Sequence, residues 1–227
     1  MGIVAIIGTV VVLVFIKEKP EKPPGPAAIE EKTFVWDGIK KFIRMRNGLI
    51  LMALFLIGMG TFNVIATFIN QIVPTGFSII EAGIIGASIV VGGIIGALII
   101  SGLSDKYRKR KIFIVIVAGA AIPFLLGITF ISVFTLLIIV ALLFGFFIMS
   151  SLPVGLEFAA EQTAPVPEGT SNGILIMMGQ IGGVIFIIGF LDFVDMTIPM
   201  MILAVLLATA FGLSLMLNER PLQETPS

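Results

Sequence analysis

The positive charges of this chain are gathered into three places. Eight of its fourteen Lys and Arg residues lie between Lys17 and Arg46, five lie between Lys106 and Lys111, and the last is Arg220. Long apolar stretches separate these places, and the loops at the other ends of those stretches hold no basic residue. Basic loops of multi-span membrane proteins stay on the cytoplasmic side. The pattern therefore predicts a membrane protein and also its orientation.

The apolar stretches predict seven transmembrane helices. A helix needs about 20 residues to cross a hydrocarbon core of about 30 Å. The expected spans are residues 2–16, 48–70, 82–101, 112–131, 134–156, 171–191 and 197–217. Only 12% of the residues are charged and 58% are hydrophobic, as expected for a chain whose solvent is lipid. Positive charges follow the segment 2–16 rather than precede it, which favours a span over a signal peptide.

The spans divide the chain into four regions. We expect a first helix at 1–16, a linker at 17–47, a six-helix part at 48–217 and a tail at 218–227. The linker starts with a Pro-rich segment that cannot be helical throughout. The predicted location is the cell membrane, and the segments expected in the cytoplasm are 17–47, 102–111, 158–170 and 218–227.

The second part of the linker has the pattern of an amphipathic helix. Within Thr33–Arg46, the apolar residues Trp36, Ile39 and Ile43 fall on one stripe of a helix, and basic residues surround it. This pattern predicts a helix that lies on the membrane surface and contacts lipid. An ordinary solvated linker helix is the alternative.

The six helices of 48–217 form two triplets of similar length, 48–131 and 134–217, that run in opposite senses. Inverted three-helix repeats of this kind build one half of many secondary transporters. The predicted fold is thus an all-α membrane protein with seven helices, six of them in two inverted repeats. Gly92 with Gly96 and Gly179 with Gly183 have the small-xxx-small spacing of close helix contacts. These contacts would lie either between two transporter halves or inside one half.

Uncharged amide side chains are the candidate substrate contacts. Gln180 lies near the middle of its span, Asn63 lies in the outer half of another, and Asn70 and Gln71 follow at that span's outer end. A buried amide is costly without a partner, so each should face another helix or a cavity. A hydrogen bond between helices is the alternative role. The acidic residues fall near span ends, which leaves no proton relay inside the membrane and favours a facilitator or uniporter.

The absence of Cys and His from the sequence limits the covalent bonds, nucleophiles and metal ligands that this protein can supply. It excludes disulfides, thiol nucleophiles and imidazole ligands for metals. We therefore expect no catalytic residue, no metal site, no cofactor and no enzymatic activity. We also expect no nucleic-acid partner.

One short loop combines an acidic residue with a basic run. In the sequence Leu-Ser-Asp-Lys-Tyr-Arg-Lys-Arg of residues 103–110, a carboxylate can pair with Arg or cap a helix and so hold one conformation. The predicted latch consists of Asp105, Lys106, Lys109 and Arg110; a plain lipid-binding anchor is the alternative. The loop resembles motif A of the major facilitator superfamily, although Ser101 and Arg108 stand where that motif has glycines.

A second block resembles one branch of this superfamily more specifically. Residues 152–161 and 165–173 are similar to the junction of the tenth and eleventh helices in the feline leukaemia virus subgroup C receptor-like branch, and Thr61–Gln71 is similar to its seventh helix. The resemblance implies helices six to twelve of a transporter that moves a small organic solute, such as a choline-like one, by alternating access. It also implies that Gln180 faces the substrate.

The acidic and hydroxyl residues around this junction are expected to be structural. They form a predicted structural loop of Glu157, Glu161, Glu168, Thr170 and Ser171. Thr170 and Ser171 would cap a helix that starts near residue 171, and Glu168 would lie at its positive end.

The implied transporter has two halves, and only one is accounted for by these spans. A missing amino-terminal half or a second copy would complete the substrate site at the interface. The alternative is a non-transporting membrane scaffold or a truncated, inactive fragment.

Overall fold

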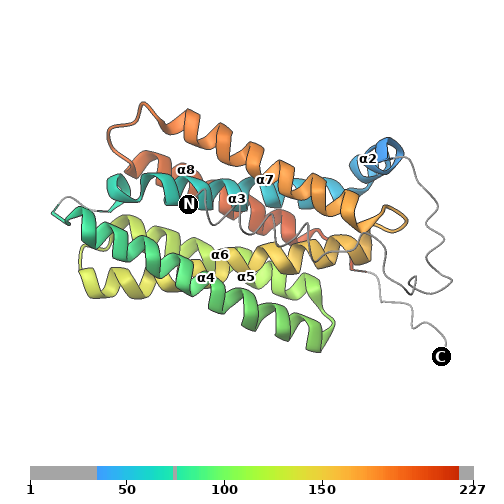
Figure 1. Ribbon diagram of the computed structural model, residues 1–227, viewed down its shortest axis with the longest axis horizontal. Helices are drawn as coiled ribbons and strands as arrows, with labels where there is room; N and C mark the ends of the chain where they lie inside the picture. Colours follow the sequence, from blue (N-terminus) through green and yellow to red (C-terminus); the bar gives the residue numbers. More distant parts are fainter. Residues whose placement is uncertain (1–34, 74–75, 220–227) are drawn as a thin grey trace, which may run out of the picture. The chain divides into compact units, whose positions relative to one another are not determined.

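The computed structural model describes residues 35–73 and 76–219, which form seven α-helices and no strand within these ranges (Figure 1). The predicted first span, most of the linker and Arg220 lie outside the described residues. The helices are α2 (Val35–Arg44), α3 (Arg46–Ile72), α4 (Ile79–Tyr107), α5 (Arg110–Phe130), α6 (Phe134–Gln162), α7 (Glu168–Phe190) and α8 (Thr197–Leu215).

The six helices α3 to α8 are long and apolar enough to cross a membrane. Their lengths run from 19 to 29 residues, close to the length that a hydrocarbon core requires. Large apolar side chains also cover their outer faces: Leu98 is 73% exposed and Val205 is 64% exposed. Such surfaces are stable in lipid and not in water, so the chain is a multi-pass membrane protein of the predicted all-α class.

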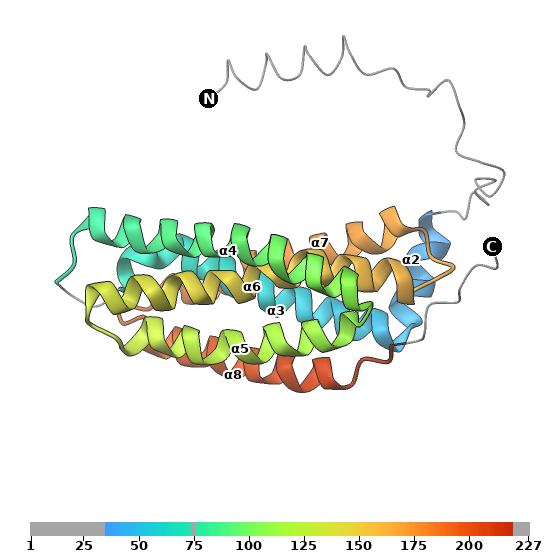
Figure 2. The same ribbon diagram turned by 90° about the horizontal axis from the view of Figure 1, so that it is seen from below.

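The helices pair in the way that two inverted repeats require. α4 packs along α6, and α7 packs along α3; α5 packs on α6, and α8 packs on α3; α5 and α8 also contact each other (Figures 1 and 2). If α3, α4 and α5 are exchanged with α6, α7 and α8, the α4–α6 pair becomes the α7–α3 pair and the α5–α6 pair becomes the α8–α3 pair. The α5–α8 pair is unchanged. The predicted relation between the triplets therefore holds in their packing.

Glycines permit close crossings of α4 with α6 and of α3 with α7. A Cβ atom at Gly96 would lie 2.0 Å from the carbonyl oxygen of Phe146 on α6, and one at Gly182 would lie 2.1 Å from that of Leu56 on α3. The helix backbones are thus in direct contact, as small residues allow in membranes. Both crossings lie inside the six-helix unit, so the glycine pattern reflects close packing within one half.

The bundle has two ends of different composition (Figure 2). The basic end is defined by α2 and by the α4–α5 and α6–α7 connections, and the opposite end by the α3–α4, α5–α6 and α7–α8 connections. Every Lys and Arg in the described ranges belongs to the basic end. The clustering predicted from sequence is therefore a clustering in space.

Two helices extend further at the basic end than their apolar stretches indicate. α4 continues to Tyr107 and α6 continues to Gln162, beyond the predicted ends at 101 and 156. The expected loops 102–111 and 158–170 shrink to short connections at 108–109 and 163–167. Hydropathy shows where the hydrocarbon contact ends, whereas a helix continues as long as its backbone hydrogen bonds do.

The helix α2 uses a different face from the predicted apolar stripe. Phe42 is fully buried and Gly38 is buried against the start of α7, whereas Trp36 is 65% exposed and Ile43 is 43% exposed. The buried face docks α2 on α3 and α7. Trp36 and Ile43 remain on the surface, where contact with lipid stays a prediction.

Candidate functional site

A four-residue ion cluster joins three helices at the basic end. Arg110 is the first residue of α5, and its guanidinium contacts Asp105 of α4 and two carboxylates of α6. Arg110 Nη2 lies 3.0 Å from Glu161 Oε1, and Nη1 lies 2.5 Å from Glu157 Oε2. The Arg110 side chain is only 12% exposed. A partly buried guanidinium with several carboxylate partners fixes the relative position of the helices that carry them.

The cluster unites residues that the sequence placed in two separate groups. Asp105 and Arg110 come from the predicted latch, whereas Glu157 and Glu161 come from the predicted structural loop. Both glutamates lie in α6 and not in a loop, because that helix extends to Gln162. Lys106 and Lys109, the other predicted latch residues, are exposed and form no ion pair within the described ranges.

The turn between α4 and α5 forms although a glycine of the resembled motif is replaced. Arg108 adopts the left-handed conformation that this position demands, with φ 51° and ψ 34°. A side chain in this region costs about 1 kcal/mol relative to glycine. The ion pairs of Arg110, two residues further on, help to hold the turn.

The junction before α7 differs from its prediction. α7 begins at Glu168, three residues earlier than expected, and Pro167 takes the N-cap position without a side-chain hydrogen bond. The capping role predicted for Thr170 and Ser171 is therefore wrong: Ser171 Oγ donates to the Glu168 carbonyl at 3.0 Å inside the helix. Glu168 lies in the first turn, where the helix dipole favours a negative charge.

Two predicted substrate residues meet where α3 crosses α7. Asn63 Nδ2 donates to Gln180 Oε1 at 3.5 Å, although 117 positions separate them. Gly183 gives the Asn63 side chain its space, since a Cβ there would lie 2.4 Å from Nδ2. Gln180 is exposed and Asn63 is half-buried, so the pair faces the surface of the bundle. It can offer both hydrogen-bond donors and acceptors to a ligand.

The polar surface continues along α3 through a residue that the sequence reasoning missed. Asn63, Thr67 and Asn70 follow a spacing of four and three residues, which places them on one face of a helix. Thr67 Oγ1 donates to the Asn63 carbonyl at 2.7 Å, and the next residue, Phe68, departs from helical geometry. A hydroxyl bonded to the carbonyl four residues back often bends a helix. The spacing of Asn63, Thr67 and Asn70 in the sequence was the signal that could have indicated this shared polar face.

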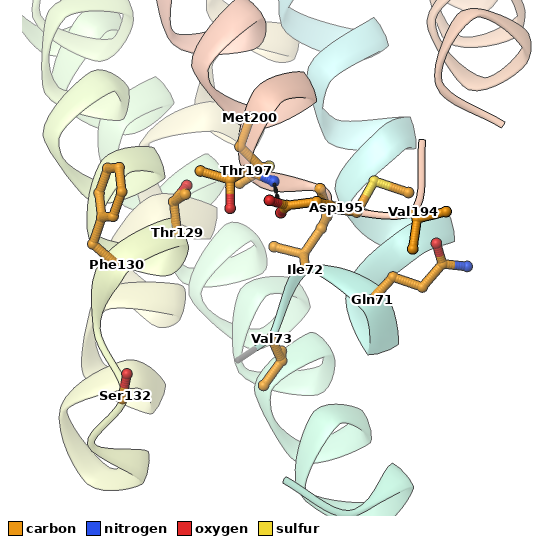
Figure 3. Close-up of a pocket in the computed structure, with 11 residues that line it drawn as sticks. Gln71, Ile72, Val73, Thr129, Phe130, Ser132, Val194, Asp195, Thr197 and Met200 are labelled. Atoms are coloured by element: carbon orange, nitrogen blue, oxygen red, sulfur yellow. Dashed lines mark hydrogen bonds between the residues drawn. The ribbon is translucent and has the colours of Figure 1, made fainter. Parts of the chain in front are cut away.

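Gln71 lies elsewhere, in a cavity of about 420 Å³ at the opposite end (Figure 3). Polar and apolar residues from α3, α5 and the start of α8 line it, and Asp195 is its charged group. Asp195 Oδ1 accepts a hydrogen bond of 2.8 Å from the Thr197 backbone N–H. This bond lowers the pKa of the Asp195 carboxyl, which is therefore ionised at neutral pH.

Comparison with known proteins identifies the family. The sequence profile of the Major Facilitator Superfamily matches residues 1–186 and 59–227. The chain belongs to the major facilitator superfamily. This superfamily consists of transporters and not of enzymes, and the six long apolar helices agree with such a protein.

Two relatives in this superfamily are much longer than the present chain. It is 33% identical over 194 residues to an uncharacterized MFS-type transporter of Caenorhabditis elegans and 34% identical over 180 residues to solute carrier family 49 member A3 of Xenopus tropicalis. It spans 31% and 37% of the lengths of these proteins. The chain therefore corresponds to about a third of the length of these relatives.

Two further relatives bear on the branch and on chain length. The human choline/ethanolamine transporter FLVCR2 is 31% identical over 220 residues, which is 86% of this chain and 39% of that protein. This match confirms the predicted resemblance to the feline leukaemia virus subgroup C receptor-like branch. An uncharacterized protein of Archaeoglobus fulgidus is 31% identical over 182 residues, and the match spans 78% of this chain and 82% of that protein.

Proposed function

We propose that this chain forms the carboxyl-side half of a secondary transporter that moves a small organic solute by alternating access. Three observations support this proposal. The profile of a transporter superfamily matches the chain, six helices can span a membrane, and their pairing follows the inverted repeats of a transporter half. The carboxylates of the described residues lie at the ends of these helices, which supports a facilitator or uniporter.

The observation that carries the proposal is the pair of amides on the surface of the bundle. Asn63 and Gln180 come from different triplets; Gln180 lies near the middle of α7, and Asn63 lies in the second half of α3. In inverted-repeat transporters, substrate sites lie near the membrane midplane where the repeats meet. We infer that this pair contacts the substrate, with Asn70 on the same face of α3. Gln71 belongs to the other cavity.

A second set of helices would have to cover this face. The pair stands on the outside of the six-helix unit, and an enclosed solute site needs walls on all sides. We propose that an amino-side half or a second copy of this chain supplies them. The match spans 82% of the length of the Archaeoglobus fulgidus relative, so that relative is similar in length to the sequence described here. A non-transporting scaffold is the remaining alternative.

Choline is the first solute to test, because the human relative is named as a choline/ethanolamine transporter. Radiolabelled choline uptake would be measured in proteoliposomes that contain the chain alone or together with a co-expressed amino-side half of a relative. We expect Gln180→Ala and Asn63→Ala each to reduce uptake about five- to thirtyfold, as for a lost polar contact of about 1–2 kcal/mol. Ile185→Ala, an exposed residue of the same helix about 140° around its axis from Gln180, is the matched control.

The two outcomes separate transport from scaffolding. Uptake that both amide variants leave unchanged would remove the pair from the substrate site. Failure of every preparation to move choline, ethanolamine or related amines would favour the scaffold.

The ion cluster is proposed as the conformational latch. Its bonds link α5 to α4 and α6 at the end where the two halves would separate on opening. Asp105→Asn should shift the balance between inward-open and outward-open states, because it removes one charged partner of Arg110. Identical accessibility of engineered cysteines in both proteins would refute this role.

We also propose an orientation in the cell membrane. The basic end faces the cytoplasm, as the positive-inside rule requires, and Trp36 and Ile43 of α2 contact the lipid surface. Labelling of sealed vesicles at Lys109 and Ser132, each replaced by Cys, tests it; accessibility of both positions from one side would contradict it.

A further inference from the structure

The inverted-repeat symmetry interchanges the triplets α3–α5 and α6–α8. Under this symmetry, the ion cluster at the basic end and the cavity at the opposite end take the same position. The cluster lies where the connection between the second and third helices of one triplet, α4 and α5, meets the end of the first helix of the other, α6. The cavity lies where the α7–α8 connection meets the end of α3. The two places are therefore equivalent positions of the inverted repeats.

Counting along the helices shows which residues correspond. The third helix of each triplet begins with Arg110 in α5 and with Thr197 in α8. The penultimate residue of the first helix is Glu161 in α6 and Gln71 in α3. Thr197 and Gln71 both line the cavity. The chain thus supplies a guanidinium at the basic end and only a short hydroxyl at the equivalent position.

The chain also covers the two places differently. After α8, Leu217 is fully buried, and the backbone N–H of Lys111, the residue after Arg110, donates to Glu219 Oε1 at 3.3 Å, so the residues after that helix contact the start of α5. After α5, only residues 131–133 precede α6. No equivalent segment covers the cavity among the described residues. The cavity of about 420 Å³ lies beside this shorter side chain and this short connection, since Thr197 and Ser132 both line it.

Charge at the opposite end favours a positive ligand. The ionisable residues of this end within the described ranges are Glu81, Asp192 and Asp195, all of them acidic. Asp195 lines the cavity, and Figure 3 shows its carboxylate between the side chains that α5 and α3 contribute. Phe130, whose side chain is 61% exposed, adds an aromatic ring to the wall. A carboxylate and an exposed aromatic ring that line the same cavity suit an organic cation.

We propose that this cavity binds a small organic cation with an ammonium or guanidinium group, which takes the place that the Arg110 guanidinium has in the equivalent site. The cation comes either from solution or from an amine-bearing lipid headgroup, because both present the same chemistry. The cavity lies at the end of the bundle and is separate from the amide pair of the proposed substrate site. It is thus an additional site at the outer surface.

A cysteine introduced into the cavity tests this proposal, because the chain has no native Cys. Ser132→Cys would be labelled with trimethylammonium-ethyl methanethiosulfonate and with a neutral ethyl reagent of similar size. The preference for the cationic reagent should fall by up to about fivefold when Asp195→Asn is added, since one charge at 4 Å supplies about that factor in water and a more distant charge supplies less. Asp192→Asn, outside the lining, is the matched control.

A second variant supplies the missing cation from the chain itself. Thr197→Arg keeps the backbone N–H that bonds Asp195 and adds the guanidinium found at the equivalent position. Millimolar choline or guanidinium should slow the labelling of Ser132→Cys in the parent chain, and this protection should be lost with Thr197→Arg. Circular dichroism of each variant verifies that the helices are intact.

The lipid composition identifies the source of the cation. In vesicles of phosphatidylglycerol alone, protection by choline or guanidinium would indicate a soluble ligand. Protection only after phosphatidylethanolamine is added would indicate a headgroup, and it would support the same cation site. Absence of protection under both conditions, with equal labelling preference in Asp195→Asn, would overturn the proposal. None of these outcomes depends on transport.

Discussion

The two ends of the bundle occupy equivalent positions of one repeated design and have opposite chemistry. At the basic end, Arg110 is held by three carboxylates, and the residues after α8 contact the start of α5. At the opposite end, Thr197 stands in the corresponding position beside a cavity that contains Asp195. The two triplets have the same helix pairings, but the residues at their helix ends differ. The inverted repeat therefore determines the framework, whereas a few end residues determine what each site can bind.

The largest expected effects concern the glycine crossings between helices, which are alike in the two triplets. Gly96→Ala and Gly182→Ala each place a Cβ about 2 Å from a backbone carbonyl, so both helix crossings must widen. We expect each to lower the free energy of unfolding by about 3 kcal/mol. Denaturant unfolding in micelles, followed by circular dichroism, measures the effect.

The control for these crossings is another glycine of α4. A Cβ at Gly102 would meet no atom within 4 Å, so Gly102→Ala should stabilise the protein by about 0.5–1 kcal/mol. A loss at Gly96 with none at Gly182 would break the equivalence of the two crossings.

The next effect separates the two ends. Arg110→Met leaves three carboxylates without their shared partner and should lower the free energy of unfolding by about 2 kcal/mol. This is less than for a fully buried pair, because Asp105 and Glu157 are 53% and 41% exposed. Thr197→Met, at the equivalent position, should change it by less than about 0.5 kcal/mol. The same unfolding assay applies, and equal losses in both variants would contradict the contrast between the ends.

A smaller effect concerns the turn beside the ion cluster. Arg108→Gly removes the side chain from a left-handed backbone conformation and should stabilise the protein by about 0.5–1 kcal/mol. Arg108→Ala, which keeps a Cβ, should give no such gain and separates backbone strain from loss of charge. If both variants stabilise the protein equally, repulsion among the basic residues is the cause.

The smallest effect concerns Asp195 and depends on pH. Its pKa is lowered in the folded protein by the hydrogen bond from Thr197, so its contribution to stability is complete above the pKa of the unfolded state. That contribution is lost as the pH falls through the lower pKa of the folded state. The melting temperature of Asp195→Ala should therefore be below that of the parent at neutral pH, and the difference should shrink in acid. A difference that is independent of pH would assign the effect to packing instead.

The spans and the charge pattern could be predicted because each depends on a local property of the chain. A run of apolar residues between 82 and 101 indicates a span wherever that run lies in the fold. The boundaries were less accurate, since polar residues continue α4 to Tyr107 and α6 to Gln162. The predicted caps at Thr170 and Ser171 failed for the same reason: α7 starts earlier, at a position that hydropathy does not mark.

The sites depend on contacts that no local pattern encodes. Asp105 and Arg110 are near each other in sequence, but Glu161 is 51 positions from Arg110. Asn63 was a separate candidate from Gln180 until the α3–α7 crossing joined them. Gln71, predicted to accompany Asn70, belongs to a different cavity, because adjacent residues of a helix point in directions about 100° apart.

The amino-acid sequence by itself determined the membrane class of this protein, six of its membrane-spanning helices, the side of the bundle that carries its positive charges and its family. Only the tertiary structure decided that the glycine pairs pack one half together, that Arg110 gathers carboxylates from two neighbouring helices, and that its counterpart is a cavity. The physical reason is that the free energy of transfer into lipid is a sum over the neighbouring residues of one helix. Hydrogen bonds, ion pairs and cavities depend on the distances between different helices.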